Sequence, residues 1–518
     1  MAEVELKLAV PPDALAALRE RLAQFGRGRT RRVDTTYFDS SDHRLAGAGA
    51  AVRLRRIGAQ WMQSLKVADG DAALATRGEW EVAAPANQLN WARFPADVRR
   101  RTLTRLRLGQ MPPLEPQFQT RFARTTWNVM VDGANVEIAL DIGQIVAGHG
   151  RGRRHEPLCE LELELKAGRR DALLRLARAI VRPAGSRVGK AGLPLLPQPL
   201  SKAARGHRLT QAAAAAAKAD RRRIVGSVQA SLNAAQALRA ILTAGGDVLW
   251  INVQGALCHD DPEFVHQARV AVRRMRSAIR LFRDDVDFPP SLARELRWIG
   301  RTLGPVRDAD VLLSETLPCR LPRSPAPADV ARTERVLAAA RRRRDATRAR
   351  MRDQLLSGRC AAAAIALMTW ACVRQGAGSA GGRPRSLQDL APKRLATVYR
   401  KLTAAARFFR ALSARRQHRV RILTKRLRYA IDVFHATLPR AQAARFSRAV
   451  ERAQDALGAL NDAAAGARAI RASNPITAET TPVSADAAGE LELIAVADRA
   501  LSELLALPVP WRVRTSPD

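Results

Sequence analysis

The 518-residue sequence is poor in cysteine, in aromatic residues and in long apolar runs. Its five cysteines form no CxxC pair and none lies at zinc-ligand spacing from a histidine, which argues against a disulfide scaffold or zinc module and favours the cytoplasm. Aromatics make up 4% of the residues while alanine is abundant, so we expect much of the chain to be helical. The longest uncharged apolar stretch, around Ala361–Val373, is too short to span a bilayer, and the N-terminus does not resemble a signal peptide.

Acidic residues are also scarce relative to basic ones. The chain has 87 Lys and Arg against 49 Asp and Glu, a formal net charge of +38. This excess favours a polyanionic partner, and the charge alone is compatible with nucleic acid, polyphosphate, acidic membrane or phosphorylated metabolites. The chain is longer than the roughly 250–300 residues that one hydrophobic core supports, so we expect several structural units.

The first part of the chain, residues 1–208, shows the period-two alternation of strands with one apolar and one charged face. Charged residues two apart recur in these runs: Glu3–Lys7, Arg53–Arg55, Glu79–Glu81 and Glu160–Glu164. Helical spacing interrupts the pattern near Pro12–Gln24 and Arg170–Val181. The sequence therefore predicts an antiparallel sheet with flanking helices.

The second part changes to apolar spacings of three and four, which predict helices. We expect an alanine-rich linker at 209–220 and a helical domain at 221–510. Glycine and proline between Gly376 and Pro384 divide that domain into halves of about 221–375 and 387–510. The predicted fold class is a multidomain α+β protein.

An internal repeat supports the division of the helical part. One block begins at His266 and continues with Arg269, Arg273 and Arg276, and 152 residues later its counterpart comprises His418, Arg421, Lys425 and Arg428. A second matched pair runs from Leu303-Gly304 to Asp308 and from Leu457-Gly458 to Asp462. These blocks predict two similar four-helix bundles related by a pseudo-two-fold axis.

The charged strand faces suggest a tunnel. A closed barrel points one face of every strand into a common interior, and buried charges there must be paired or bind ions. Carboxylates would hold hard cations, and Arg and Lys would bind phosphoryl oxygens. The sequence contains no Walker A motif and no Ser/His/Asp or Cys/His nucleophile arrangement in this half, so hydrolysis is favoured over kinase-type transfer.

The strand region resembles the CYTH superfamily of triphosphate tunnel enzymes. The resemblance rests on an ordered set of motifs: Glu3-Val-Glu5-Leu-Lys7, Asp34–Asp39, Val52–Arg55, Ser64–Lys66, Arg77–Glu81, Arg121–Trp127, Glu137–Gly143, Glu160–Glu164 and Ser201–Gly206. It implies an eight-stranded antiparallel tunnel, open at both ends, that acts on triphosphate substrates with a divalent metal, Mg²⁺ or Mn²⁺.

The resemblance also implies roles for individual residues. The implied metal ligands are Glu3, Glu5, Asp141, Glu160 and Glu162. The implied triphosphate-binding residues are Lys7, Arg53, Arg55, Lys66, Arg124 and Lys202. The implied catalytic residues are Glu5, Lys7, Glu79 and Glu81, and alternation allows both of the last two to face inward. Arg121 is a weaker candidate than Arg124, because three residues along a strand reverse the face.

The repeated basic stripe resembles the CHAD domain, a helical module with conserved histidines that often follows a CYTH domain. The likeness covers about 221–510 and implies polyphosphate binding on the surface between two bundles, through His266, Arg269, Arg273, Arg276, His418, Arg421, Lys425 and Arg428. One departure is Asn461, where the first repeat has Arg307. Neither His266 nor His418 has a metal-ligand pattern common to both repeats, so we expect no metal there.

The sequence therefore predicts a cytoplasmic inorganic triphosphatase with a polyphosphate-binding module, and association with polyphosphate granules is compatible with this. Two alternatives stay open: a tunnel that acts on an organic triphosphate, as adenylyl cyclase or thiamine triphosphatase, and a binding protein with a non-catalytic tunnel. We expect no membrane partner and no specific nucleic acid, although backbone binding by charge alone stays open. The sequence does not define the oligomeric state.

Overall fold

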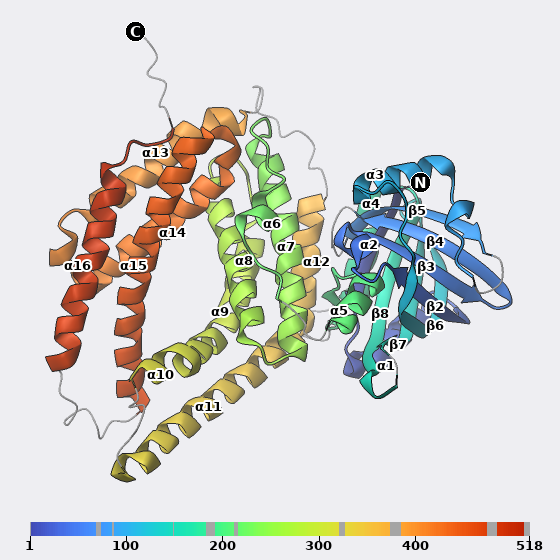
Figure 1. Ribbon diagram of the computed structural model, residues 1–518, viewed down its shortest axis with the longest axis horizontal. Helices are drawn as coiled ribbons and strands as arrows, with labels where there is room; N and C mark the ends of the chain where they lie inside the picture. Colours follow the sequence, from blue (N-terminus) through green and yellow to red (C-terminus); the bar gives the residue numbers. More distant parts are fainter. Residues whose placement is uncertain are drawn as a thin grey trace, which may run out of the picture. The chain divides into compact units, whose positions relative to one another are not determined.

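The computed structural model describes residues 2–68, 74–84, 88–148, 150–182, 192–211, 216–320, 327–372, 385–473 and 484–511. The chain divides into two compact units, shown with all their elements in Figure 1. The first comprises Met1–Ala217, Gly246–Phe264 and Asp353–Arg374, and the second comprises Lys218–Gly245, Val265–Arg352 and Gln375–Asp518. The linker expected at Gly376–Pro384 and the histidine at 149 lie outside the described residues.

Eight antiparallel strands close into a barrel in the first unit. Their order around the ring is β5-β4-β3-β2-β6-β7-β8-β1, and pairing of β1 with β5 closes it. The bounds are β1 Ala2–Ala9, β2 Arg29–Asp39, β3 Ala50–Ile57, β4 Gln60–Ala68, β5 Leu74–Ala83, β6 Glu115–Val131, β7 Ala134–Ala147 and β8 Arg154–Ala167. A two-residue strand, β9 (Leu196–Pro197), extends the edge of β1. The described residues thus confirm the eight-stranded antiparallel barrel.

The apolar faces of β1, β3, β4, β7 and β8 point outward, against helices. Leu6 and Leu8 of β1 share a core with Leu161 and Leu163 of β8 and with residues of α1 (Leu15–Ala23) and α4 (Arg170–Val181). These two helices match the predicted helical stretches. The alanine-rich helix α12 (Gly358–Cys372) joins the same core, and α3 (Ala96–Leu106) covers β3 and β4.

Helix α5 (Lys202–Thr210) packs into the barrel in a way that the sequence did not predict. Its Ala203 and Leu209 pack against Tyr37 and Phe118, which belong to the inward-facing sets of β2 and β6. Gly206 fits so closely that an added Cβ would lie 2.0 Å from the Phe118 ring. A helix therefore fills one end of the barrel interior, whereas the resemblance implied a tunnel open at both ends.

The second unit is all-helical in its described residues. Its helices and those that continue into the first unit are α6 Arg221–Val225, α7 Ala234–Cys258, α8 Pro262–Leu281, α9 Pro290–Val311, α10 Leu317–Arg320, α11 Pro327–Leu355, α13 Leu387–Ala406, α14 Ala414–Val433, α15 Arg440–Ser473 and α16 Ser484–Ala506. A π-helical turn, Leu312–Thr316, connects α9 to α10. A short helix, α2 (Arg44–Gly47), belongs to the barrel unit.

The two repeat helices, α8 and α14, contact each other. Arg274 of α8 donates a hydrogen bond to Asp432 of α14 over 2.5 Å and lies over the ring of Tyr429. Phe282 and Phe434, which follow the two helices, pack edge to face with ring centroids 6.0 Å apart. The duplicated sequence blocks are therefore neighbours within one unit; the pseudo-two-fold axis stays a prediction.

By length and composition, α7 is apolar enough to cross a membrane, and 61% of its apolar window is buried within the fold. The helices at Thr333–Leu355 and Gly358–Cys372 pass the same test only as a pair bent by 59°. Core helices of globular proteins share these properties, so the finding is weak support for a membrane span.

Candidate functional site

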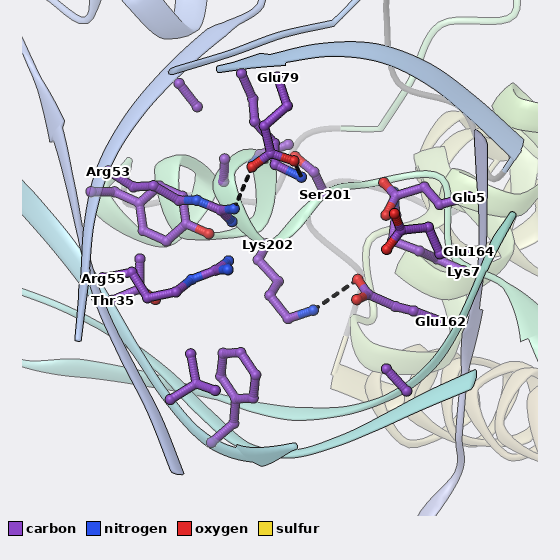
Figure 2. Close-up of a pocket in the computed structure, with 18 of the residues that line it drawn as sticks. Glu5, Lys7, Thr35, Arg53, Arg55, Glu79, Glu162, Glu164, Ser201 and Lys202 are labelled. Atoms are coloured by element: carbon purple, nitrogen blue, oxygen red, sulfur yellow. Dashed lines mark hydrogen bonds and ion pairs between the residues drawn. The ribbon is translucent and has the colours of Figure 1, made fainter. Parts of the chain in front are cut away.

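The barrel encloses a cavity of about 550 Å³ lined by charged side chains (Figure 2). Strand register explains why they converge: Lys7 lies opposite Glu162, Arg53 opposite Ser64, and Arg124 opposite Asp141. Directly opposed residues in a sheet point to the same face, so the alternating charges of all these strands enter one interior. The volume is within the range of about 300–1,000 Å³ typical of ligand sites.

One wall of the cavity carries three cations and two carboxylates. The Nη2 atom of Arg53 lies 2.7 Å from Glu79 Oε1 and 3.6 Å from Glu81 Oε1. The Nζ atom of Lys66 lies 2.6 Å from Glu79 Oε2. Both glutamates line the cavity, but the Glu81 side chain is 42% exposed and the Glu79 side chain 18%. Glu79 thus holds two cations in place, while Glu81 faces solvent.

Arg55 is the least compensated cation of this wall. Its nearest carboxylate contact, to Glu81, measures 3.9 Å, and its buried Nε atom has no hydrogen-bond partner among the described residues. Burial, with repulsion from Arg53 and Arg124, lowers the pKa of Arg55 to about 10. A buried guanidinium in this condition is well suited to bind an anion, because an oxyanion would restore both charge balance and hydrogen bonding.

The opposite wall gathers three carboxylates around one ammonium group. Lys202 of α5 places its Nζ atom 2.7 Å from Asp141 Oδ2 and 2.9 Å from Glu162 Oε1, and it also pairs with Glu160. Arg124 adds a two-point contact to Asp141 over 2.7 and 2.6 Å. Lys202 is carried here because the Ser201 side chain caps α5 by accepting a hydrogen bond from the backbone N–H of Ala204.

Two carboxylates of this cluster, Glu160 and Glu162, have pKa values that are shifted in opposite directions. Burial raises the pKa of Glu160. Burial also opposes ionisation of Glu162, but Lys202 and Arg124 outweigh it and hold the pKa of Glu162 well below its usual range. Burial alone would lower the pKa of Lys202. The carboxylates of Asp141 and Glu160 outweigh this effect, so the pKa is raised. The ammonium therefore stays charged.

The cluster also suits a divalent metal. One carboxylate oxygen each from Asp141, Glu160 and Glu162 lies within 4.8 Å of the others. A donor set made only of oxygen fits Mg²⁺ or Mn²⁺. These three residues could therefore hold such an ion, provided that Lys202 moves away from the oxygens it now contacts.

Strand β1 contributes Glu5 and Lys7, which are buried and joined by a 2.9 Å ion pair between Nζ and Oε1. Both line the cavity. The side chain of Glu3 lies outside the described residues, although its backbone pairs with residue 77 of β5. The remaining predicted tunnel residues line the cavity, except that Asp141 and Glu160 are fully buried beside it, in contact with Lys202. Arg121 is exposed and hydrogen-bonds to Gln119.

Two residues of the cavity region were not singled out from the sequence. Arg205 of α5 donates to Glu160 Oε2 over 3.0 Å and to Glu156 Oε1 over 2.6 Å. His207, one helical turn after Ala203, lines the cavity. Arg205 belongs to the Ser201–Gly206 motif and lies three residues after Lys202, so the two share a helix face. No sequence motif pointed to His207.

The second unit carries the repeated basic stripe on α8 and α14. Burial and repulsion from Arg421 and Arg273 lower the pKa of Lys425 to about 8. Burial lowers the pKa of Arg421 as well, with Asp462 opposing and Arg273 adding to the effect. Because Arg273 belongs to α8, cations of both repeats act on each other at short range. Such mutual repulsion is relieved when an anion binds between them.

The other residues of the basic stripe on α8 and α14 differ in their hydrogen-bond partners and in their burial. Arg269 donates to the Gly300 carbonyl over 3.3 Å, and His418 contacts Asn461 over 3.0 Å. Arg428 is directed to α15, where it contacts Gln454 and Glu451. Burial, together with neighbouring arginines, lowers the pKa of Arg276. His266, half-buried, is also on α8.

Comparison with known proteins identifies both parts of the chain. The CYTH domain model matches residues 1–187, and the CHAD domain model matches residues 240–471. An inorganic triphosphatase of Haemophilus influenzae is 30% identical over 168 residues, which are 32% of this chain and 46% of that protein. The match thus spans less than half of that relative's length.

Solved structures give matches for each part. A CHAD domain from the plant Ricinus communis is 27% identical, covers 57% of this chain and 99% of its own, and has a TM-score of 0.44. A putative adenylyl cyclase from Hippeastrum, described as having a dominant triphosphatase activity, is 18% identical, covers 40% and 95%, and has a TM-score of 0.29. The predicted combination of a CYTH and a CHAD domain is confirmed, as is the α+β fold class.

Proposed function

Because the chain combines a CYTH domain at residues 1–187 with a CHAD domain at 240–471, we propose that it is a metal-dependent inorganic triphosphatase with a polyphosphate-binding module. The tunnel would hydrolyse tripolyphosphate to pyrophosphate and phosphate. The related Haemophilus influenzae protein, named an inorganic triphosphatase, supports this reaction class.

The observation that carries the proposal is the incompletely neutralised basic wall. Arg55 is buried beside Arg53 and lacks a close carboxylate, and Lys66 completes the wall. A linear triphosphate would place several anionic oxygens along this wall, with Arg124 and Lys202 reaching it from the opposite side. The cavity lining contains Tyr37 and Phe122 but offers few other aromatic faces for a base, which favours the inorganic substrate.

The residues of the tunnel would divide the work. A divalent ion held by Asp141, Glu160 and Glu162, with Glu3 and Glu5, would neutralise phosphoryl oxygens and acidify a bound water. Arg53, Arg55 and Lys66 would orient the triphosphate, as would Lys7. Glu79 would hold the Arg53 and Lys66 side chains in position, and the more exposed Glu81 would orient water.

The test is phosphate release from tripolyphosphate by the full-length chain with Mg²⁺ or Mn²⁺, beside the Glu5→Gln variant. Glu5→Gln keeps the side-chain volume but removes the charge paired with Lys7. We expect metal-dependent release that falls at least about 100-fold in the variant, the magnitude typical for loss of a key electrostatic group. His155→Asn, on an exposed β8 residue outside the cavity, is the matched control.

ATP and thiamine triphosphate, assayed under the same conditions, separate the remaining alternatives. Faster turnover of either organic substrate than of tripolyphosphate would replace the inorganic assignment. Binding of tripolyphosphate without turnover of any substrate would make the tunnel a receptor.

The CHAD domain is proposed to bind inorganic polyphosphate through Arg273, Arg421 and Lys425, the cations that the two repeats bring together. A polymer without bases needs no aromatic stacking, and the chain has only three tyrosines. Tethering would raise the local concentration of chain ends. We therefore expect Arg421→Ala to slow turnover of medium-length polyphosphate while leaving tripolyphosphate turnover unchanged. Equal rates for the variant and the wild type on both substrates would argue against tethering.

A further inference from the structure

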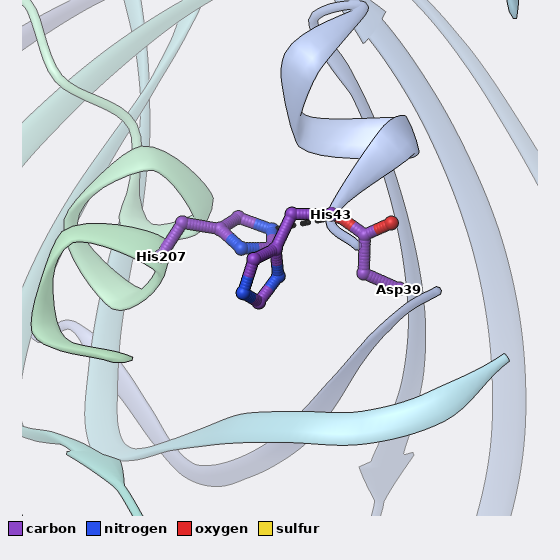
Figure 3. Close-up of side chains that lie close together, drawn as sticks. All are labelled: Asp39, His43 and His207. Atoms are coloured by element: carbon purple, nitrogen blue, oxygen red, sulfur yellow. Dashed lines mark ion pairs between the residues drawn. The ribbon is translucent and has the colours of Figure 1, made fainter. Parts of the chain in front are cut away.

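Asp39, His43 and His207 converge in one group (Figure 3). The group shares no residue with the acidic cluster, and of the three His207 alone lines the barrel cavity. Asp39 ends β2, His43 directly precedes α2, and His207 lies on α5. One ligand atom from each residue lies within 4.8 Å of the other two. The Nε2 atom of His207 is 3.6 Å from Asp39 Oδ2, and the two imidazole ring centroids are 5.7 Å apart at an interplanar angle of 81°.

Both imidazoles contain a nitrogen atom that lacks a hydrogen-bond partner among the described residues. The Nδ1 atoms of His43 and His207 are shielded from solvent, and neither has a hydrogen-bond partner in the part of the chain that the structure describes. His207 is 9% exposed as a residue. Leaving a buried polar atom unpaired costs about 1–3 kcal/mol. Two incompletely bonded imidazoles that converge on one carboxylate indicate that the group is completed by something it binds.

The carboxylate of Asp39 is already oriented for this purpose. Its Oδ1 atom accepts hydrogen bonds from the backbone N–H groups of Ser40 and Leu45 over 2.8 and 2.9 Å. Its Oδ2 atom accepts one from Ala46 over 2.9 Å and has lone-pair capacity left on the side of His207. Backbone donors that fix a carboxylate in this way are typical of carboxylates that bind metal ions, because they hold the free oxygen lone pairs toward the ion.

We propose that Asp39, His43 and His207 bind one transition-metal ion of the zinc type. Imidazole nitrogen favours Zn²⁺, Co²⁺ or Ni²⁺, whereas Mg²⁺ favours oxygen, so this group and the acidic cluster select different ions. Donors at bond lengths of about 2.0–2.1 Å lie about 3.3 Å apart around a tetrahedral ion. Side-chain shifts of about 1 Å would bring the three donors to this spacing.

Three protein ligands leave one coordination position of a tetrahedral ion open. His207 also lines the cavity, so the group adjoins the α5 end of the proposed triphosphate site, toward which the open position could face. A water or a phosphoryl oxygen could fill it. Binding of the ion itself requires no turnover by the tunnel, so the metal site is testable whatever the tunnel's activity is.

The experiment uses untagged full-length protein stripped with a chelator and titrated with Co²⁺ in the presence of excess Mg²⁺, which occupies the oxygen-only sites. We expect about one Co²⁺ per chain, with visible absorption bands typical of low-coordinate cobalt. His43→Asn should weaken binding at least tenfold, since outer-shell changes alone cost about 10–100-fold. Asparagine suits the left-handed backbone of His43, where φ is 57°.

His155→Asn is the control, because it removes an exposed histidine of the same unit that hydrogen-bonds to Gln144. A circular-dichroism melt checks that each variant is folded, and His207→Gln replaces His43→Asn if the latter is not. Zn²⁺ should raise the melting temperature of the wild type and of His155→Asn only. Failure of the wild type to retain Co²⁺ under excess Mg²⁺, or equal affinity in His43→Asn, would overturn the proposal.

Discussion

The Nζ atom of Lys202 lies 2.7 Å from the Oδ2 atom of Asp141, and both side chains are almost completely shielded from solvent. The same ammonium contacts Glu160 and Glu162. Those oxygens are also the ones that a divalent cation would need. The lysine and a bound metal would therefore compete for one set of carboxylates, and a phosphate group that draws Lys202 away would free them.

Replacement of Lys202 by methionine tests this competition. Removing one partner of a buried ion pair leaves uncompensated charge, so we expect Lys202→Met to lower the free energy of unfolding by about 3 kcal/mol. Added Mg²⁺ should restore more stability to the variant than to the wild type, because the carboxylates have lost their internal cation. Thermal unfolding with and without Mg²⁺ measures both effects.

Lys166→Met is the control for that experiment, since Lys166 is 40% exposed and pairs with Glu164 over 2.7 Å. An exposed pair contributes at most about 1 kcal/mol. If Mg²⁺ stabilises the wild type and Lys202→Met to the same extent, the lysine does not compete with the metal.

A second prediction contrasts neighbouring arginines of the basic wall. Arg55→Met should weaken tripolyphosphate binding at least tenfold yet leave the melting temperature of the free protein unchanged or higher, because the fold gives Arg55 little compensation. Arg53→Met should weaken binding and also lower the melting temperature, because it leaves Glu79 with one cation fewer. Calorimetric titration with tripolyphosphate measures the effect on binding, and thermal unfolding measures the effect on the melting temperature. A fall in melting temperature for Arg55→Met as large as for Arg53→Met would contradict this interpretation.

The barrel could be predicted from the sequence because its signal is local. Alternate residues of a strand point to opposite faces of the sheet, so the sequence itself shows which residues share a face. Charges on one face of several strands require a shared interior, as at Arg53–Arg55 and Glu79–Glu81. The number of eight strands came from the resemblance to CYTH enzymes, and the pairing of β1 with β5 that closes the ring is a finding of the structure.

Contacts that depend on distant segments could not be predicted in this way. Asp39 and His207 are 168 residues apart, and no periodicity links them. Helix α5 is nine residues long, too short for a clear helical pattern, so its position inside the barrel was missed. Helix α12 is apolar on all sides, which predicts burial but not that its partner is α4.

Gly206 provides a third prediction. A Cβ at this position would lie 2.0–2.5 Å from the Phe118 ring, which is itself stacked on Tyr37 with centroids 4.6 Å apart. Gly206→Ala should therefore destabilise the barrel unit by about 1–3 kcal/mol through overpacking. Gly458→Ala, in α15 where an added Cβ meets nothing within 4 Å, should stabilise its helix by up to about 1 kcal/mol. Denaturant unfolding of both variants measures the contrast; a Gly206→Ala variant as stable as the wild type would show that α5 can move away from Phe118.

Lys425 gives the fourth prediction, which concerns pH. Burial and the neighbouring Arg421 and Arg273 lower its pKa to about 8 from an ordinary value of 10.5. The ammonium is thus charged below about pH 8 and progressively neutral above it. Polyphosphate attracts the charged form, so affinity should fall as the pH rises through 8. The free fold shows the opposite trend: between 8 and 10.5 the unfolded chain binds more protons, so the contribution of Lys425 to stability rises with pH.

Lys425→Arg isolates this effect, because a guanidinium keeps its charge throughout the range. Fluorescence anisotropy of labelled polyphosphate, measured at constant ionic strength from one unit below to one unit above pH 8, should show a decline for the wild type and a flatter profile for the variant. Parallel profiles would assign the pH dependence to another group. A flat profile for both proteins would place polyphosphate away from Lys425, and therefore away from the contact between α8 and α14.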